Sequence, residues 1–127
     1  MSNSPDISLY LIKGTIRIHR STIHVLGYPK FIRLMVSNDG RSVLLLPAQE
    51  KDFQSFRVPK NLGDANWKFE IGCIKFCRFL IGNLSWEPLA SYRISADLYV
   101  PSHYVRFCLF NGLLLPSNNR SASKVEN

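Results

Sequence analysis

The segment KGTIRIHRSTIHVLGYPKFIRLMVSNDGRSVLLL, residues 13–46, carries the strongest structural signals in the chain. Ile16 and Ile18 alternate with polar or basic residues at a period of two, which is typical of a half-buried strand. A short helical turn follows and ends at Gly27, since glycine adopts the left-handed conformation at little cost. The segment therefore predicts a strand, a helical turn and then further strands.

Residues 31–36 and 41–46 are predicted to form a β-hairpin. The turn between them ends at Gly40, which takes a positive φ angle without steric cost. The second strand contains four consecutive apolar residues at 43–46. This absence of alternation indicates a central strand that is covered on both faces.

The C-terminal half predicts one main helix and a second hairpin. Trp67 and Ile71 begin a series of apolar residues at three- and four-residue spacing, so we expect an amphipathic helix at about 66–81. Residues 92–99 and 104–109 alternate as strands do. The predicted fold class is α+β: antiparallel β-hairpins with a short N-terminal helical turn and one main amphipathic helix.

The length of 127 residues fits one domain, and 46% hydrophobic and 20% charged residues are ordinary globular values. We expect a mobile N-terminus at 1–6, a single α+β domain at 7–115 and a disordered tail at 116–127, because the tail has too few apolar side chains to offset ordering entropy. Three cysteines and a polar start without a signal-peptide pattern favour a cytoplasmic protein. No apolar run is long enough to span a bilayer, so we expect no membrane partner.

Catalytic and metal-binding motifs are missing from the sequence. Nucleophilic catalysis needs a serine or cysteine beside a histidine, and zinc needs three or four converging ligands. His19, His24 and His103 are not spaced for either task, and Cys73 and Cys77 are typical of small residues in a helix core. We therefore expect a non-enzymatic protein without a metal or cofactor.

The charge distribution favours a polyanionic partner. Sixteen Lys and Arg against nine Asp and Glu give a formal charge of +7, and residues 13–46 contain six basic residues and one acid. Paired strands would gather these side chains on one basic β-face that contacts phosphates. The alternative is that they are solvated residues that guard sheet edges. The candidate nucleic-acid-binding residues are Lys13, Arg17, Arg20, Lys30, Arg33 and Arg41.

The order of elements from Ile16-Arg17-Ile18 through Leu26-Gly27 to the hairpin that ends at Pro47 resembles the AbrB-type transcription regulator module. The resemblance implies DNA binding, transcription regulation and an interleaved homodimer. Leu26–Ile32 and Ser91–Ile94 are also similar to small uncharacterised proteins of clostridial genomes and their mobile elements. That second resemblance implies a bacterial cytoplasmic setting.

Three functions are compatible with these patterns. The leading hypothesis is a non-enzymatic DNA-associated regulator or accessory protein that binds nucleic acid through the basic β-face. The second is a protein–protein interaction module without nucleic-acid binding, whose exposed apolar patch would contain Tyr28, Phe31 and Met35. The third is a small-ligand-binding domain or an enzyme, with its pocket between the main helix and the second hairpin.

Overall fold

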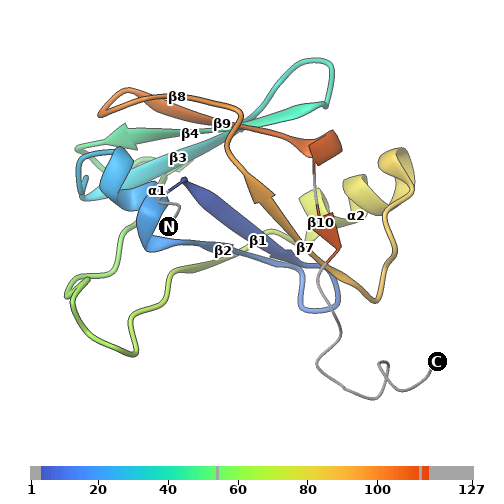
Figure 1. The fold of residues 1–127 in the computed structure, drawn as a ribbon, viewed down its shortest axis with the longest axis horizontal. Coiled ribbons are helices and arrows are strands. Elements are labelled where there is room, and N and C mark those ends of the chain that lie inside the picture. The colour runs from blue at the N-terminus through green and yellow to red at the C-terminus, as the bar shows by residue number, and fades with distance from the viewer. Residues whose placement is uncertain (1–3, 54, 112, 115–127) are drawn as a thin grey trace.

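Two antiparallel five-stranded sheets lie face to face in the computed structural model of the protein, which describes residues 4–53, 55–111 and 113–114 (Figure 1). In sheet A the strands lie in the order β10 (Leu113–Leu114), β7 (Ser91–Ser95), β1 (Asp6–Tyr10), β2 (Thr15–Ile18) and β6 (Glu70–Gly72). In sheet B the order is β5 (Ser55–Arg57), β3 (Phe31–Val36), β4 (Ser42–Ala48), β9 (Tyr104–Cys108) and β8 (Leu98–Val100). The protein is a mixed α+β domain.

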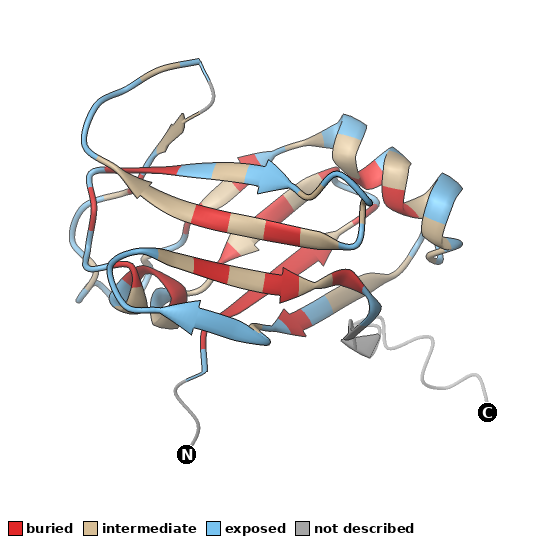
Figure 2. Cartoon of the chain, turned by 90° about the horizontal axis from the view of Figure 1, so that it is seen from above, coloured by how far each residue is buried: buried red, intermediate tan, exposed pale blue. Residues whose placement is uncertain are grey.

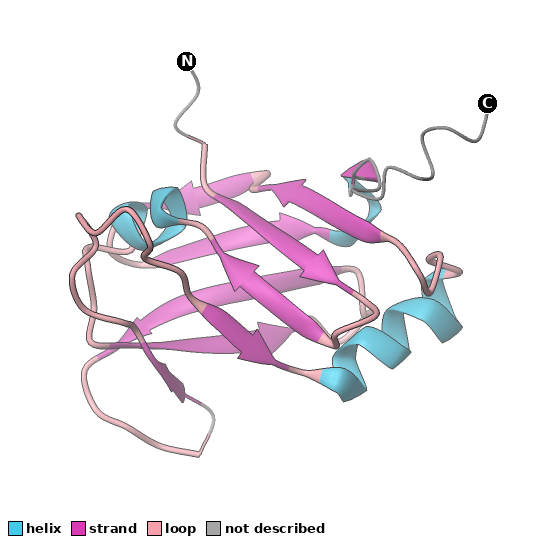
Figure 3. Ribbon diagram, turned by 90° about the horizontal axis from the view of Figure 1, so that it is seen from below, coloured by secondary structure: helices cyan, strands magenta, loops and turns pink. Residues whose placement is uncertain are grey.

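Helices cover the ends of the two layers. The helix α1 (Arg20–Val25) connects sheet A to sheet B, and the longer α2 (Ile74–Leu84) follows β6. A single 3₁₀ turn, η1 (Leu109–Asn111), follows β9. Figure 3 shows α1 and α2 at opposite ends of the molecule.

Alternation along the strands places the core between the sheets. The inward side chains are fully buried: Ile7, Leu9, Ile16 and Ile18 from sheet A, and Ile32, Val43, Leu45, Val105 and Phe107 from sheet B. Figure 2 shows buried and more exposed residues alternating along the strands of sheet B, the nearer layer. The outer faces of the two sheets therefore point to opposite sides of the molecule.

The N-terminal strand begins within the segment that was expected to be mobile. Asp6, the first residue of β1, is 8% exposed and pairs with Arg93. The remaining part of that segment at 1–3 and the predicted tail at 116–127 lie outside the described residues.

The predicted helix at about 66–81 begins too early. Instead of a helical turn, Glu70–Gly72 forms β6, which pairs with β2 so that Ile71 lies opposite Ile16. Phe69 and Ile71 are buried two residues apart, while Glu70 between them is half-buried on the other side. Ile71 fits the helical period together with Trp67 and the strand period together with Phe69, and pairing with the edge of β2 decides in favour of the strand.

The predicted strand at 92–99 is divided between the two sheets. Its first part is β7, which pairs with β1, and its second part is β8, which pairs with β9. Between them the backbone N–H of Ala96 donates to Pro5 O at 2.8 Å, and that of Asp97 donates to Arg106 O at 3.0 Å. These two hydrogen bonds lead the chain out of sheet A and into sheet B.

Candidate nucleic-acid interface

Three neighbouring hollows lie along α1, with volumes of about 360, 540 and 180 Å³. The first and second share Arg20 and Ser21, and the second and third share Tyr28 and Leu62. We call the three hollows together the α1 groove. One wall is formed by the end of β2, α1 and the corner after α1. The other is formed by Arg57 and the connection 58–69 between β5 and β6, which lies at the left of Figure 1.

The lining of the α1 groove is strongly basic. Of the described residues that line the three hollows, none is an aspartate or a glutamate. Two imidazoles, those of His19 and His24, add neutral or positive groups. A hollow surrounded by one sign of charge concentrates counter-ions of the other sign. The cationic side chains that line it are Arg17, Arg20, Lys30, Arg57, Lys60 and Lys68.

The basic face of α1 follows from the residues that the helix buries. Thr22 and Ile23 are fully buried, and Thr22 Oγ1 donates a hydrogen bond of 2.8 Å to the carbonyl of Asp6 on β1. Arg20 and His24 lie one helical turn apart on the other side and are exposed. The buried pair therefore turns both basic side chains toward the α1 groove.

Trp67 forms part of the opposite wall. Its indole N–H donates to the carbonyl of Pro59 at 3.0 Å, and its ring makes an edge contact with Phe69 at 6.4 Å between ring centroids. The guanidinium of Arg20 lies 5.5 Å from the centroid of the Trp67 ring and donates to the carbonyl of Asp64. These contacts fix both the tryptophan and the arginine in the groove.

A left-handed corner after α1 presents a second aromatic ring. Gly27 has a φ of +82° and Tyr28 a φ of +56°. The left-handed conformation costs a residue with a side chain about 1–2 kcal/mol. Tyr28 is nevertheless 56% exposed, and its ring makes an edge contact with the imidazole of His24 at 5.4 Å between centroids. The corner holds this ring at the junction of two hollows.

The six residues predicted from the sequence fall into two sets. Those that line the α1 groove are Arg17, Arg20 and Lys30. Those that lie outside it are Lys13, Arg33 and Arg41. Since Arg17 is on sheet A and Arg33 on the outer face of sheet B, the six side chains do not share one β-face.

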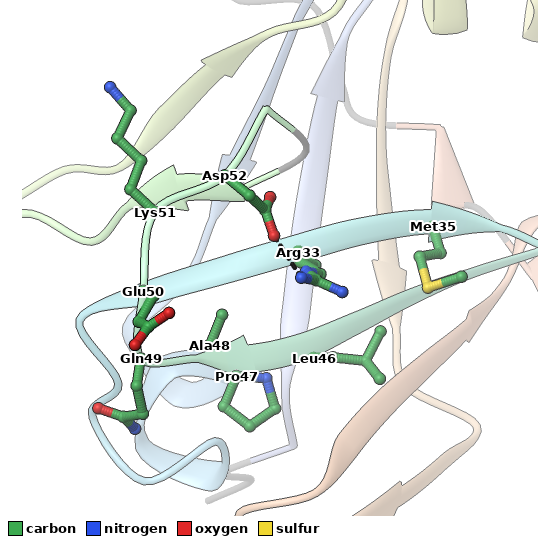
Figure 4. A pocket seen from close by; sticks show the side chains of 9 residues that line it. All are labelled: Arg33, Met35, Leu46, Pro47, Ala48, Gln49, Glu50, Lys51 and Asp52. Carbon is green, nitrogen blue, oxygen red and sulfur yellow. Dashed lines mark hydrogen bonds and ion pairs between the residues drawn. The ribbon is translucent and has the colours of Figure 1, made fainter.

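The surroundings of Arg33 differ from the α1 groove in charge. It lines a hollow of about 480 Å³ on the outer face of sheet B, where its guanidinium forms an ion pair with Asp52 (Figure 4). Lys51 and Glu50 also line this hollow, so its lining contains two cations and two carboxylates. A polyanion gains little electrostatic energy there.

Glu70 forms an ion pair with a cation that lines the first hollow. Arg17 Nη2 donates to Glu70 Oε2 at 2.8 Å, and Lys13 Nζ lies 3.3 Å from Glu70 Oε1. The hydrogen bond from Arg17 is the main reason that the pKa of Glu70 lies below its ordinary value. Glu70 is therefore ionised at neutral pH and partly neutralises Arg17.

The pairing of β1 with β2 brings together a serine and a histidine that no sequence pattern connects. Ser8 Oγ and His19 Nε2 are 2.8 Å apart, and burial followed by the charge of Arg93 lowers the pKa of His19. Ser8 is 2% exposed and has Arg17 and Arg93 as its cross-strand neighbours. Because the hydroxyl of Ser8 is buried, the Ser8–His19 hydrogen bond has the geometry of a structural contact.

Within the described residues, no three His, Cys, Asp or Glu side chains converge as metal ligands would. Cys73, Cys77 and Cys108 are free thiols, and the hydrogen bond with Cys77 raises the pKa of Cys73. Cys77 is buried in α2 as expected, whereas Cys73 precedes the helix and is half-buried. No helix in the described part of the chain has the length and apolar character needed to cross a membrane.

The apolar patch predicted from Tyr28, Phe31 and Met35 does not form. Phe31 is only 7% exposed and has the guanidinium of Arg57 5.2 Å from its ring centroid. Tyr28 lines the α1 groove, while Met35 lines the hollow on sheet B. The three side chains belong to different surroundings.

Sequence reasoning missed the groove residues of the segment 57–68. Arg57 and Lys60 lie on either side of Val58-Pro59, and Lys68 follows Trp67, so three cations and an aromatic residue occur in a stretch that forms no helix. This combination is a signal of nucleic-acid binding that could have been found.

Comparisons with family models, with curated proteins and with solved structures give no match for this chain.

Proposed function

We propose that the protein binds nucleic acid in the α1 groove. The observation that carries this proposal is the lining of the groove: six cations from two stretches of the chain, 17–30 and 57–68, with no carboxylate among the described lining residues. Phosphate groups are the polyanion that such a lining fits, since each Lys or Arg replaces a condensed counter-ion of the nucleic acid. The proposal moves the binding surface from a flat β-face to this groove.

Within this proposal the protein is a non-enzymatic accessory or regulatory factor of the cytoplasm. Its contacts are to phosphates, which position a nucleic acid without reading its sequence. In a regulatory role, the choice of binding site would then be set by which parts of the nucleic acid are accessible, or by a second component that reads the sequence.

The proposal is tested by fluorescence anisotropy with labelled single-stranded and duplex oligonucleotides at about 50 mM salt. The double variant Arg20→Ala with Lys68→Ala removes one arginine and one lysine from the groove, and Arg33→Ala with Lys51→Ala removes the same charges from the hollow on sheet B. We expect the first variant to lose affinity and the second to bind as the original protein does. Binding of neither oligonucleotide form to the original protein would reject the proposal, and an equal loss in both variants would reject its location.

A second candidate function, self-association, is favoured by the edge strand β8. Leu98, Tyr99 and Val100 are 41%, 43% and 38% exposed, and β8 ends the strand order of sheet B. An apolar edge with unpaired backbone groups pairs with an identical edge in antiparallel fashion, so the occupant proposed here is a second copy. Light scattering after size-exclusion chromatography should give a dimer, and Tyr99→Lys should give a monomer; a monomeric original protein contradicts this candidate.

A further inference from the structure

The α1 groove offers aromatic faces as well as positive charge. Tyr28 lies where the second and third hollows meet, and Trp67 lines the first. Each ring is held by the protein: Tyr28 by its corner and its contact with His24, Trp67 by its contact with Phe69. Fixed rings lose little entropy when a planar ligand stacks on them.

The polar atoms of both rings are already engaged within the protein. The indole N–H of Trp67 donates to the carbonyl of Pro59, and the hydroxyl of Tyr28 forms a hydrogen bond with His24 Nδ1. Neither group is left to read the edge of a base. Two flat surfaces remain available for stacking with a ligand. One is the ring face of Tyr28, and the other is the guanidinium plane of Arg20, which lies over the Trp67 ring. Bases stack on guanidinium planes as they do on aromatic rings.

The shape of the site excludes the usual way of reading a duplex. A duplex reader inserts a protruding helix or ribbon into the major groove, about 12 Å wide. Here α1 has six residues, lies beside the connection 58–69 and forms one wall of a concave site. A duplex that touched the groove would present its phosphates, and its bases would stay stacked inside, out of reach of Tyr28.

We infer that the ligand of the α1 groove is a single-stranded nucleic acid, with bases stacked on Tyr28 and on the Arg20–Trp67 pair and phosphates bound by the lining cations. This inference rests on the function proposed above and names its substrate class. Combining a positive groove with aromatic stacking is the way in which single strands are bound with little sequence preference. Since the ring donors of Trp67 and Tyr28 are already engaged within the protein, stacking on these two sites tolerates different base sequences.

Two measurements test the inference. The first measurement uses the variant Trp86→Phe, in which Trp67 is the one remaining tryptophan of two. The replaced Trp86 does not line the groove and packs on Tyr92, with 4.0 Å between the ring centroids. We expect a single strand of about 12 nucleotides to quench the Trp67 fluorescence and a duplex of the same length to leave it unchanged. In a competition titration the single strand should bind at least about ten-fold more tightly than the duplex. This difference in affinity corresponds to roughly one base stack that the duplex does not make.

The second measurement uses the ring of Tyr28. Tyr28→Ala should weaken single-strand binding by at least about five-fold, whereas Tyr28→Phe, which keeps the ring, should bind normally. Phe53→Ala removes a ring that is 94% exposed and lines none of the three hollows, and it serves as the matched control. Equal affinity for duplex and single strand, or an unchanged affinity of Tyr28→Ala, would overturn this inference and leave nucleic-acid binding intact. Absence of binding to both forms would overturn this inference and the proposed function together.

Discussion

Removing Arg57 and Lys60 together should make nucleic-acid binding less sensitive to salt. Both side chains line the third hollow of the α1 groove, and no ion pair with a carboxylate is found for either among the described residues. Each cation that contacts a phosphate releases one condensed counter-ion, so the salt dependence of binding counts the contacts. The double variant Arg57→Ala with Lys60→Ala therefore changes a measurable slope.

The magnitude follows from the lining. Within the described part of the chain, Arg17 is the groove cation that pairs with a carboxylate, that of Glu70, and the other five have no such ion pair. At about 0.7 per phosphate contact of a single strand, five contacts give a slope near −3.5 for log affinity against log salt, and three contacts give about −2.1. Between about 50 and 200 mM salt the original protein should lose roughly 130-fold in affinity, and the variant roughly 20-fold.

The assay is an anisotropy titration of a labelled single strand at four or more salt concentrations in that range. Lys75→Ala with Arg78→Ala is the matched control, because it removes one lysine and one arginine from the exposed surface of α2 at the other end of the molecule. We expect the control to keep the slope of the original protein. The reasoning is refuted by an unchanged slope in the groove variant, or by an equal decrease in the control.

Three further predictions concern the surroundings of the groove and the fold. Glu70→Gln should make the salt slope steeper by about 0.7 and strengthen binding at low salt, because it frees the arginine that it neutralises; a weaker affinity contradicts this. Gly27→Ala should lower the free energy of unfolding by about 1–2 kcal/mol, because φ is +82° and the new Cβ would lie 2.8 Å from Ser102 Oγ. Gly82→Ala in α2, where the new Cβ meets no atom within 4 Å, should raise the free energy of unfolding by about 0.5–1 kcal/mol. Urea denaturation measures both changes. Burial lowers the pKa of His19 below 6.5 in the folded protein, so the unfolded chain binds the proton first as the pH falls. The stability that is present above about pH 6.5 should therefore decrease toward pH 5.5, and His19→Gln should flatten this decrease in urea titrations.

Local patterns predicted the parts of the fold in which one face of a strand is buried. Ile16 and Ile18 are fully buried and Arg17 between them is half-buried, as their alternation predicts. The predicted helix at about 66–81 is wrong at its start because Ile71 fits the helical period with Trp67 and the strand period with Phe69, and only the distant edge of β2 selects the strand. Contacts between distant segments are not encoded in a local period.

The candidate site shows the same limit. Arg17, Arg20 and Lys30 were found because basic residues cluster in one segment, but Lys60 and Lys68 join them only through the return of the connection 58–69 to α1. A charge count cannot separate a cation with a carboxylate partner from one without. Among the described residues, most cations of the α1 groove have no carboxylate partner, whereas Arg33 is paired with Asp52, and this difference decides where a polyanion gains most electrostatic energy.

The most direct test of the central claim maps the contact surface on the ¹⁵N-labelled protein during titration with a single-stranded oligonucleotide. We expect the amide signals that shift to belong to residues 19–30 and 57–68, the two walls of the α1 groove. The outer face of sheet B around Arg33 and Met35 should keep its signals unchanged. Shifts confined to that outer face, with none along α1, would contradict the account.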